Sequence, residues 1–379
     1  MAERALATVD LGAVRANGAR LRARLTGGAE LCAVVKADGY GHGAAACAGA
    51  AIAGGATRLA VATAGEAEEL GGRFEGVRLL TMGALLPPEV DTVLAAGSEL
   101  ALWSGELMRV VAARARAAGR PAAVHVKLDS GMGRLGSRDP EAVRELARAC
   151  ADDPDLELAG LWTHFATADE PDTSYLDEQI DRFAALAAEI RSEHPGITVH
   201  AANSAATLVE PRSHFDMARC GVALYGLDPF QGDPRGRGLE PALSFRSYVA
   251  DTKRLAAGEP VGYGRTWRAP AETWIGVIPI GYGDGVRRAL SNNAEVLVGG
   301  RRHPVVGTVS MDNITVDLGP ATAVRGGDEA VLIGRQGAAE IRAEEVAERL
   351  GTINYEVTTA LSARVRREHP PAGGSGERR

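Results

Sequence analysis

The sequence has few of the features that assign a chain to a specialised class of protein. It contains only four cysteines, and they are scattered without a CxxC pair or a metal-ligand spacing: Cys32, Cys47, Cys150 and Cys220. We therefore expect free, mostly buried thiols and no metal site. Basic residues are not in excess either. The formal net charge of -7 leaves no electrostatic footprint for binding nucleic acid.

Long apolar segments are missing as well. The longest weakly polar run, residues 43–56, consists mostly of Ala and Gly and is too short to span a bilayer. The first residues contain no apolar segment of the signal-peptide type, so we expect a cytoplasmic protein without membrane association. The fractions of apolar residues (45%) and charged residues (24%) are ordinary for a soluble globular protein, and 379 residues are enough for two domains.

Short β-type runs alternate with helix-type runs over residues 11–226. The predicted strands are residues 30–36, 58–62, 77–82, 99–103, 122–128, 156–164, 197–202 and a last one around 215–219. Helical spacing of apolar residues is clearest over 11–25, 104–118 and 175–191. Thr63 and Glu66 match a capping box and predict a further helix start. Eight alternations in roughly 215 residues favour a (β/α)8 barrel of the TIM type. A doubly wound open sheet is the alternative architecture.

Polar residues at the ends of these predicted strands strengthen the barrel interpretation. They are Lys36, Lys127, Asp129, His164, Asn203, Ser204 and Arg219. In a closed barrel the carboxyl ends of all strands open on one face, where active sites lie. We therefore expect these residues, which are remote in sequence, to converge.

The character of the chain changes after residue 226. Residues 227–241 are rich in Pro and Gly and are typical of a linker. Beyond them, the β-type runs 243–255, 274–280, 295–298 and 330–333, a hairpin turn at 299–302 and a helix over 343–350 indicate a mainly β domain. We predict a barrel domain over 12–230, a mainly β domain over 231–368 that the N-terminal strand (residues 1–11) can join, and a disordered tail over 369–379.

One glycine motif does not support a dinucleotide site. Gly131, Gly133 and Gly136 match GxGxxG after a predicted strand. A Rossmann site needs those glycines to open a helix at once. Here the N-cap signal comes later, at Asp139 followed by Pro140, so we do not assign a dinucleotide site.

The segment around Lys36, residues 33–43, carries the most chemical information. A lysine at a strand end is often only a solvated charge. At a barrel mouth, however, partial burial lowers the pKa of a lysine and makes its amine suitable for a Schiff base. The glycines that follow allow a sharp turn, and Tyr40 can present its hydroxyl to an anion. These residues alone leave both interpretations open.

The same segment resembles the cofactor-lysine motif of the alanine racemases, which are fold type III pyridoxal-phosphate enzymes. Further segments resemble the family in order along the chain: residues 125–136, 163–169, 202–205, 219–226, 261–265, 280–284, 310–312 and 353–356. The resemblance implies pyridoxal 5'-phosphate as cofactor, a homodimer with shared active sites, and interconversion of L-alanine and D-alanine for peptidoglycan. A racemase for serine or for a broader range of amino acids shares nearly every feature and remains the alternative.

The resemblance also implies roles for the barrel residues. Lys36 would hold the cofactor as a Schiff base and act as one acid/base, and Arg219 would lie against the pyridine nitrogen. The phosphate would be bound by Tyr40, Ser204, the backbone of Gly221 and Val222, and Tyr355, and the cofactor set includes His164 and Asn203. By residue type alone, a surface salt bridge is the usual state of an arginine such as Arg219. Ser204 could equally be a helix N-cap, and both roles can hold together.

Other roles implied by the resemblance fall largely outside the barrel. Inversion at Cα needs a proton-transfer group on each face of the substrate, and Tyr263 would be the second acid/base, contributed across a dimer interface. A tyrosine of ordinary pKa near 10 is a poor base at neutral pH, and His164 would provide a proton relay to it. Arg134 and the backbone of Met311 would bind the substrate carboxylate, and Lys127 resembles a lysine that is often carbamylated. Entrance residues would be Asp169, Tyr282 and Asp312.

Two other classes are less compatible with the sequence. Fold type III decarboxylases use a catalytic cysteine in the second domain, and no cysteine follows Cys220 here. A non-catalytic carrier of pyridoxal phosphate would need only the barrel. The family motifs around Tyr263 and Met311 in the second half of the chain argue against that class.

Overall fold

The structure, a computed structural model, describes residues 3–370. The chain divides into two compact units. One contains Val14–Tyr40 and Ala44–Phe230, and the other contains the residues up to Ala13, Gly41–Gly43 and the residues from Gln231 onward. Of the tail predicted over residues 369–379, residues 371–379 lie outside the described part of the chain.

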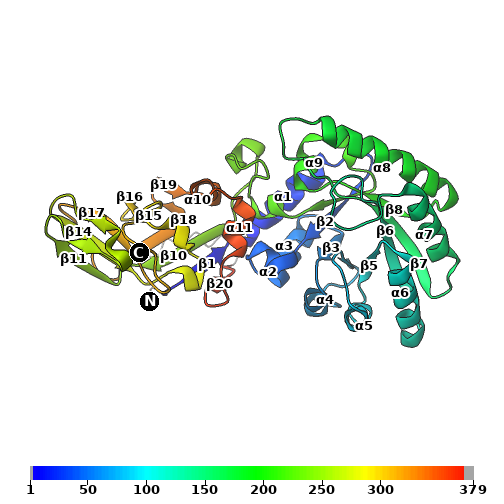
Figure 1. Cartoon of the computed structure of the whole chain (residues 1–379), viewed down its shortest axis with the longest axis horizontal. Coiled ribbons are helices and arrows are strands. Elements are labelled where there is room, and N and C mark those ends of the chain that lie inside the picture. Colours follow the sequence, from blue (N-terminus) through cyan, green and yellow to red (C-terminus); the bar gives the residue numbers. More distant parts are fainter. Residues whose placement is uncertain (1–2, 371–379) are drawn as a thin grey trace. The chain divides into compact units, whose positions relative to one another are not determined.

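The first unit is a closed barrel of eight parallel strands arranged in sequence order, drawn in blue to green in Figure 1. Its strands are β2 (Glu30–Val34), β3 (Arg58–Val61), β4 (Arg78–Thr81), β5 (Glu99–Leu102), β6 (Ala122–Lys127), β7 (Leu156–Trp162), β8 (Thr198–His200) and β9 (Met217–Cys220). The barrel closes where β2 pairs with β9, with Cys32 opposite Arg219. The predicted (β/α)8 barrel is confirmed, and closure excludes the open sheet.

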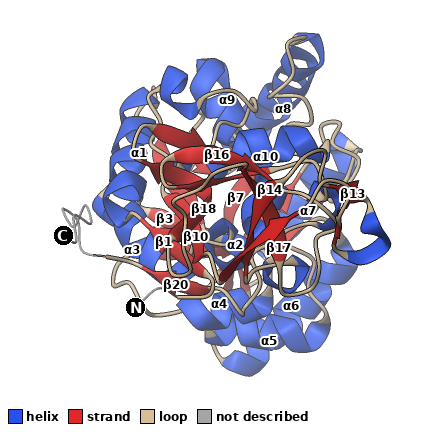
Figure 2. Cartoon of the chain, turned by 90° about the vertical axis from the view of Figure 1, so that its left-hand side faces the viewer, coloured by secondary structure: helices blue, strands red, loops and turns tan. Residues whose placement is uncertain are grey.

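Helices surround the barrel strands (Figure 2). They are α1 (Leu11–Arg24), α3 (Ala44–Ala53), α4 (Ala64–Leu70), α5 (Pro87–Ala95), α6 (Gly105–Ala118), α7 (Pro140–Asp152), α8 (Ser174–Glu193) and α9 (Ser204–Val209), with 3-10 turns η1 (Pro211–Ser213) and η2 (Val222–Tyr225). The short segment α2 (Lys36–Tyr40) is a left-handed turn after β2 rather than a regular helix. Because helices cover the outside and side chains fill the inside, strands such as β3 and β5 are buried along their whole length. All four cysteines are free and buried, as predicted.

The second unit is mainly β. Its strands are β1 (Leu6–Val9), β10 (Leu243–Tyr248), β11 (Asp251–Leu255), β12 (Pro260–Val261), β13 (Trp267–Arg268), β14 (Thr273–Ile278), β15 (Glu295–Val298), β16 (Arg301–Pro304), β17 (Ile314–Gly319), β18 (Glu329–Gln336), β19 (Ala339–Ile341) and β20 (Arg366–Glu368). Its helical elements are η3 (Pro234–Arg237), η4 (Tyr263–Arg265), η5 (Tyr282–Asp284), η6 (Arg288–Leu290), α10 (Ala343–Leu350) and α11 (Asn354–Thr359). The predicted mainly β domain after the barrel is confirmed.

Three sheets make up this unit. The largest has the order β16-β15-β18-β10-β1-β20, with β19 paired to β18, and smaller sheets are formed by β11-β14-β17 and β12-β13. Strand β1 pairs antiparallel with β10 and parallel with β20. The predicted hairpin is present, since Val298 pairs with Arg301 across the glycine turn.

The prediction of one β-type run over 243–255 is wrong in one respect. These residues form two strands, β10 and β11, which belong to different sheets. The backbone N–H of Val249 donates to Asp328 O at 2.8 Å, whereas that of Ala250 donates to Val277 O at 2.7 Å. The chain thus changes hydrogen-bonding partners between two consecutive residues. Within residues 3–370, no helix is both long and apolar enough to cross a membrane.

Candidate active site

Lys36 follows the last residue of β2, Val34, by two positions and stands at the start of a left-handed turn. Ala37 and Asp38 both have φ of 52°, and Tyr40 has φ of 55°. These values lie in the left-handed region, which costs a residue with a Cβ on the order of 1–2 kcal/mol. As the sequence predicted, the glycines that follow take part in the turn, with φ of 60° at Gly39, 83° at Gly41 and 96° at Gly43, but three non-glycine residues share the left-handed conformation. Such strain persists only where the surrounding structure holds it in place.

Glu66, in the first turn of α4, holds this turn. Its carboxylate accepts the backbone N–H of Ala37 at 2.6 Å, as well as those of Ala62 at 2.8 Å and Thr63 at 3.2 Å. The sequence predicted Glu66 as part of a capping box with Thr63, and this is confirmed. Its bond to Ala37 was not predicted. One carboxylate therefore caps a helix and fixes the backbone next to Lys36.

We expect Glu66→Ala to lower the free energy of unfolding by about 1–3 kcal/mol, because charge-assisted hydrogen bonds to a strained turn are lost. The reaction of the Lys36 amine with an added aromatic aldehyde should also slow. Urea unfolding and stopped-flow absorbance measure the two effects. Glu69→Ala, an exposed change on the same helix, is the control. Equal behaviour of the two variants would contradict this role.

The chain contains only three lysines, and two of them stand at the carboxyl ends of barrel strands. Lys36 follows β2 and Lys127 ends β6, whereas Lys253 is an exposed residue of β11 that pairs with Asp251 at 3.0 Å. The two lysine amines of the barrel unit thus both lie at the carboxyl ends of its strands.

The environment of both barrel lysines favours the neutral amine. Burial, followed by the charges of Arg219 and Arg134, lowers the pKa of Lys127 to about 7. Its Nζ lies 3.9 Å from the centroid of the Trp162 ring. Burial and then the charge of Arg134 likewise lower the pKa of Lys36. Since the unprotonated amine is the nucleophilic form, both shifts favour reaction of these amines as nucleophiles.

Stability should depend on pH through Lys127. Its pKa is about 7 in the folded protein, against an ordinary value of 10.5. Between these values the unfolded chain binds more protons, so the free energy of unfolding rises with pH, by up to about 1.4 kcal/mol per pH unit. We expect Lys127→Met to flatten the rise, measured by urea unfolding from pH 7 to 10 in buffer free of carbon dioxide. Lys253→Met should keep the wild-type slope, and a wild-type slope in Lys127→Met would refute the assignment.

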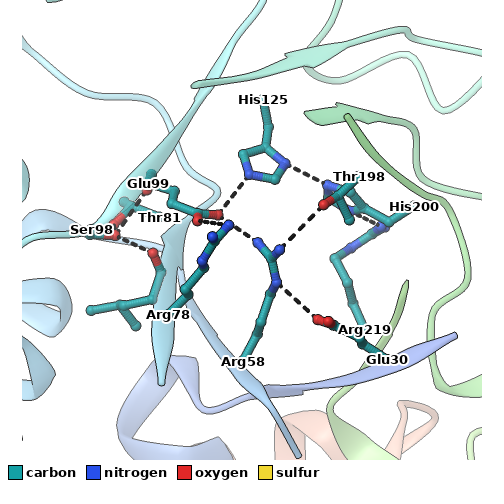
Figure 3. A network of polar contacts seen from close by, with 11 residues as sticks. Glu30, Arg58, Arg78, Thr81, Ser98, Glu99, His125, Thr198, His200 and Arg219 are labelled. Atoms are coloured by element: carbon teal, nitrogen blue, oxygen red, sulfur yellow. Dashed lines mark hydrogen bonds and ion pairs between the residues drawn. The ribbon is translucent and has the colours of Figure 1, made fainter. Parts of the chain in front are cut away.

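Arg219 is buried, with only 3% of its surface exposed. Its Nη1 lies 2.8 Å from His200 Nδ1 (Figure 3), and its Nη2 donates to Thr163 O at 2.8 Å and to Ala201 O at 2.9 Å. Burial lowers the pKa of Arg219 to about 10, so the guanidinium still keeps its proton at neutral pH. The alternative of a surface salt bridge is wrong.

His164 also forms a hydrogen bond with the guanidinium of Arg219. Its Nδ1 lies 3.2 Å from Arg219 Nη2. Burial and then the charge of Arg219 lower the pKa of His164 well below its ordinary value. Because an arginine can only donate, His164 Nδ1 accepts this bond and the proton of the neutral ring sits on Nε2.

A small polar cradle lies between β8, β9 and the turn after Lys36. Ser204 Oγ accepts the backbone N–H of Gly221 at 3.0 Å. A Cβ on Gly221 would lie 2.6 Å from Tyr40 Cζ, so only glycine leaves room for the Tyr40 ring. Burial raises the pKa of Tyr40, which keeps its hydroxyl a neutral donor. The cap of α9 is Asn203, whose side chain accepts from Ala206 N, so the alternative of Ser204 as the N-cap is wrong.

The glycine-rich loop after β6 folds back onto its own strand. The Asp129 carboxylate accepts the backbone N–H groups of Gly131 at 3.1 Å and Gly133 at 3.0 Å, and the Nε of Arg138 at 3.0 Å. Arg134 is an exposed residue of this loop. Helix α7 begins only at Pro140, with Asp139 as its N-cap. As predicted, the glycines do not open a helix.

Five predicted site residues belong to the mainly β unit: Tyr263, Tyr282, Met311, Asp312 and Tyr355. Tyr263 begins η4, and Thr308 Oγ1 donates to its backbone O at 2.8 Å. Its exposed fraction is 74%, and Met311 and Tyr282 are exposed by 51% and 43%. Asp169, in the barrel unit, is exposed and Tyr355 is half-buried.

The segments that carry Tyr282 and Met311 are joined to each other. The backbone N–H of Tyr282 donates to Ser310 O at 3.0 Å, and that of Gly283 donates to Met311 O at 2.9 Å. The fully buried Asp284 accepts Arg4 Nη1 at 3.0 Å and Gly281 N at 3.0 Å. Asp312 accepts Arg364 Nη2 at 2.6 Å. These partners hold the backbone of Met311 in place.

Sequence reasoning did not identify His200, Asp284 or the second role of Glu66. His200 ends β8, and the rule that selected His164, a polar residue near the end of a predicted strand, would have selected it too. Asp284 lies in a short turn without a periodic signal, so no local pattern marks it as buried.

Comparisons with known proteins agree along nearly the whole chain. The family described as alanine racemase, N-terminal domain, matches residues 9–229, and the alanine racemase C-terminal domain matches residues 242–369. An alanine racemase of Symbiobacterium thermophilum is 44% identical over 363 residues, covering 95% of this chain and 96% of the relative. The crystal structure of alanine racemase from Streptomyces lavendulae has a TM-score of 0.92 at 37% identity, covering 98% of each chain. That of Streptomyces coelicolor has a TM-score of 0.91 at 39% identity, covering 97% of this chain and 98% of its own.

Proposed function

The chain belongs to the alanine racemase family, a family of isomerases, and from this premise we propose that it interconverts L-alanine and D-alanine with pyridoxal 5'-phosphate as cofactor. The observation that carries the proposal is that Lys36, whose pKa is lowered, lies near the buried guanidinium of Arg219. Two of the three lysines stand at the mouth of the barrel, and Lys36 begins a strained turn there. Arg219, the cationic neighbour of both, keeps its proton.

The residues present fit this cofactor. The lowered pKa of Lys36 favours the neutral amine that a covalent bond to an aldehyde requires. The cradle around Gly221, which a Cβ would fill, offers the hydroxyls of Tyr40 and Ser204 and the start of η2 at Val222 to a phosphate. Hydroxyls and backbone N–H groups bind an anion without a full positive charge. Asn203 would support the cradle through α9, and we assign Tyr355 to the same phosphate by family resemblance.

When bound, pyridoxal phosphate withdraws electrons from the substrate and makes its Cα proton acidic. Inversion then requires one group on each face of Cα. We assign Lys36 to the face that handles D-alanine and Tyr263 to the face that handles L-alanine. The Nε2–H of neutral His164 is suited to relay protons through hydrogen bonds toward Tyr263.

Arg219 would donate a hydrogen bond to the cofactor ring nitrogen and retain its own proton. A guanidinium that stays protonated cannot fully protonate the ring. The ring is then a weaker electron sink, which limits side reactions such as transamination. The pKa of Arg219, although lowered by burial, is still about 10, so the guanidinium remains a protonated hydrogen-bond donor at neutral pH. This supports the proposed role.

The substrate carboxylate would be bound by Arg134 and by the backbone N–H of Met311. Arg134 lies in the exposed loop that Asp129 anchors, and Met311 is held by the backbone bonds to Gly283. The nearly neutral Lys127 would be carbamylated and would then balance the charge of Arg134. Entrance residues would be Asp169, Tyr282 and Asp312.

We further propose that the enzyme acts as a homodimer in which each site receives Tyr263 from the partner. The exposed fractions of Tyr263 (74%), Met311 (51%) and Ile353 (46%) support this, because a side chain that a partner subunit covers is exposed in a single subunit. The D-alanine formed would supply peptidoglycan synthesis.

The decisive experiment is incubation of the cofactor-loaded protein with a panel of L-amino acids, followed by quantification of each D-product on a chiral column. We expect D-alanine to dominate. Comparable yields of D-serine or of several other D-amino acids would replace the proposal with a racemase of broader range. Absence of any D-product, with cofactor bound, would refute racemase activity.

A further inference from the structure

The amino ends of the barrel strands carry charged side chains. Glu30, Arg58 and Glu99 are the first residues of β2, β3 and β5. Arg58 lies 3.1 Å from the Glu30 carboxylate and 2.9 Å from that of Glu99, and its Nη2 lies 3.3 Å from Thr198 Oγ1 (Figure 3). Arg58 and Glu99 are 7% and 6% exposed. The interior of such barrels is usually filled by apolar side chains, so a buried ion pair here has a desolvation cost that calls for a reason.

A chain of hydrogen bonds leads from this layer to the carboxyl ends of the strands. Glu99 Oε2 lies 2.8 Å from His125 Nε2, and His125 Nδ1 lies 2.9 Å from His200 Nε2. His200 Nδ1 lies 2.8 Å from Arg219 Nη1. Both histidines have no exposed surface. Figure 3 shows the chain running from Glu99 through the two imidazole rings to Arg219.

Only one arrangement of protons satisfies these contacts. Arg219 can only donate, so His200 Nδ1 accepts and the proton of His200 sits on Nε2. That N–H donates to His125 Nδ1, which places the proton of His125 on Nε2 as well. The second N–H then donates to the Glu99 carboxylate, which can only accept while it is ionised. Every bond in the chain therefore points from Arg219 toward Glu99.

A glycine in the barrel leaves space for the hydrogen-bonded residues between Glu99 and Arg219. Gly160, on β7, lies beside the His125 ring, and a Cβ there would lie 2.6 Å from His125 Cε1 and 2.8 Å from Thr198 O. The Trp162 ring stacks on His200 with a centroid distance of 5.7 Å and an interplanar angle of 9°. The imidazole rings of His125 and His200 are thus held by packing as well as by hydrogen bonds.

In the described part of the chain, Arg219 has no carboxylate partner of its own. Within residues 3–370 its hydrogen bonds go to imidazole nitrogens and backbone carbonyls. Burial would raise the pKa of Glu99, but the hydrogen bond from His125 and the charges of Arg58 and Arg78 lower it below its ordinary value, so Glu99 remains an anion. Glu99 is therefore the anion to which Arg219 is linked by hydrogen bonds through His200 and His125.

We propose that Glu99 is a positioning residue for Arg219, acting through His125 and His200 to hold both imidazole protons on Nε2. The effect on catalysis rests on the proposed function, since it assumes that Arg219 faces the cofactor ring. The proton arrangement itself does not depend on that assumption. With both protons on Nε2, His200 presents a lone pair to Arg219. A reversed arrangement would set two donors against each other and displace the guanidinium.

Glu99→Gln tests the inference, because the amide removes the charge and can donate as well as accept. In the wild-type holoenzyme, nitrogen NMR of labelled histidine should show His125 and His200 protonated on Nε2 only. Glu99→Gln should shift the His200 nitrogens, lower kcat for alanine racemisation by roughly tenfold, as loss of an outer partner does for ligating histidines, and leave KM nearly unchanged. Glu99→Asp, which keeps the charge, should restore part of kcat.

Glu30→Gln is the matched control. It makes the same change in the same layer, on a carboxylate that also pairs with Arg58 but does not touch His125. It should leave the His200 nitrogens and kcat as in the wild type. If Glu99→Gln alone does not fold, the double variant Arg58→Met/Glu99→Gln removes both buried charges together, a change that buried pairs often tolerate.

Three results would overturn the inference: His200 protonated on Nδ1 in the wild type, unchanged His200 nitrogens and kcat in Glu99→Gln, or identical effects of Glu99→Gln and Glu30→Gln. A wild-type enzyme that does not racemise alanine would refute the proposed function instead. In that case the histidine nitrogens would still decide whether Glu99 directs the proton arrangement.

Discussion

Replacing Lys36 by alanine is expected to abolish covalent attachment of pyridoxal phosphate and to lower racemisation by at least about a thousandfold in both directions, since one residue provides both the nucleophile and one proton-transfer group. The amine is the one that the strained turn after β2 presents at the barrel mouth. Visible absorbance of the loaded protein and chiral quantification of alanine measure the two losses.

A direct chemical test accompanies this variant. Borohydride reduction of the loaded wild-type protein should fix the cofactor on one lysine, which peptide mass spectrometry can assign among the three that the chain contains. We expect Lys36. Lys253→Ala, an exposed residue paired with Asp251, should bind cofactor and racemise alanine normally. Recovery of the reduced cofactor on Lys127, or retained attachment in Lys36→Ala, would be incompatible with the assignment.

Tyr263→Phe should reduce racemisation by a factor of about 10²–10⁴, the usual contribution of a general acid or base. The ring stays and only the hydroxyl is removed, so cofactor absorbance should not change. Because Lys36 would serve the other face, the Cα proton of D-alanine should still exchange with heavy water, whereas exchange from L-alanine should be lost. Proton NMR of each enantiomer in heavy water follows both reactions separately.

The control for this prediction is Tyr248→Phe, a half-buried residue of β10. It makes the same chemical change and should leave both exchange reactions intact. Equal loss of exchange from L-alanine and D-alanine in Tyr263→Phe would show that the hydroxyl does not serve one face of the substrate. The two-base assignment would then fail, while the role of Lys36 could still stand.

The strands of the barrel were predictable because each is an apolar run bounded by polar residues. All eight were placed within a few residues of their observed limits, and the caps at Thr63 and Asp139 marked helix starts correctly. The ends were less accurate. The predicted strand 30–36 stops at Val34 because the left-handed turn begins, and a positive φ at Ala37 leaves no trace in composition.

Contacts between distant segments could not be predicted in this way. The run 243–255 is continuous in sequence, yet it changes sheets at Val249 and Ala250 because their carbonyl partners belong to different strands or loops. The bond between Glu66 and Ala37 spans 29 positions, and those from Glu99 to His125, His125 to His200 and His200 to Arg219 span 26, 75 and 19. No local pattern encodes such pairs.

The sequence by itself determined the order of strands and helices and, through family motifs, the proposal that Lys36, Arg219 and Tyr263 are site residues. Hydrophobic periodicity is a local property, so it can be read from neighbours along the chain. Only the tertiary structure decided the chemical state of the buried groups. Burial sets the pKa of Lys127 and of Arg219, and closure of the barrel aligns Glu99 with Arg219 through two imidazoles. Desolvation and hydrogen-bond direction depend on what surrounds an atom in space, and that is defined only once the chain has folded.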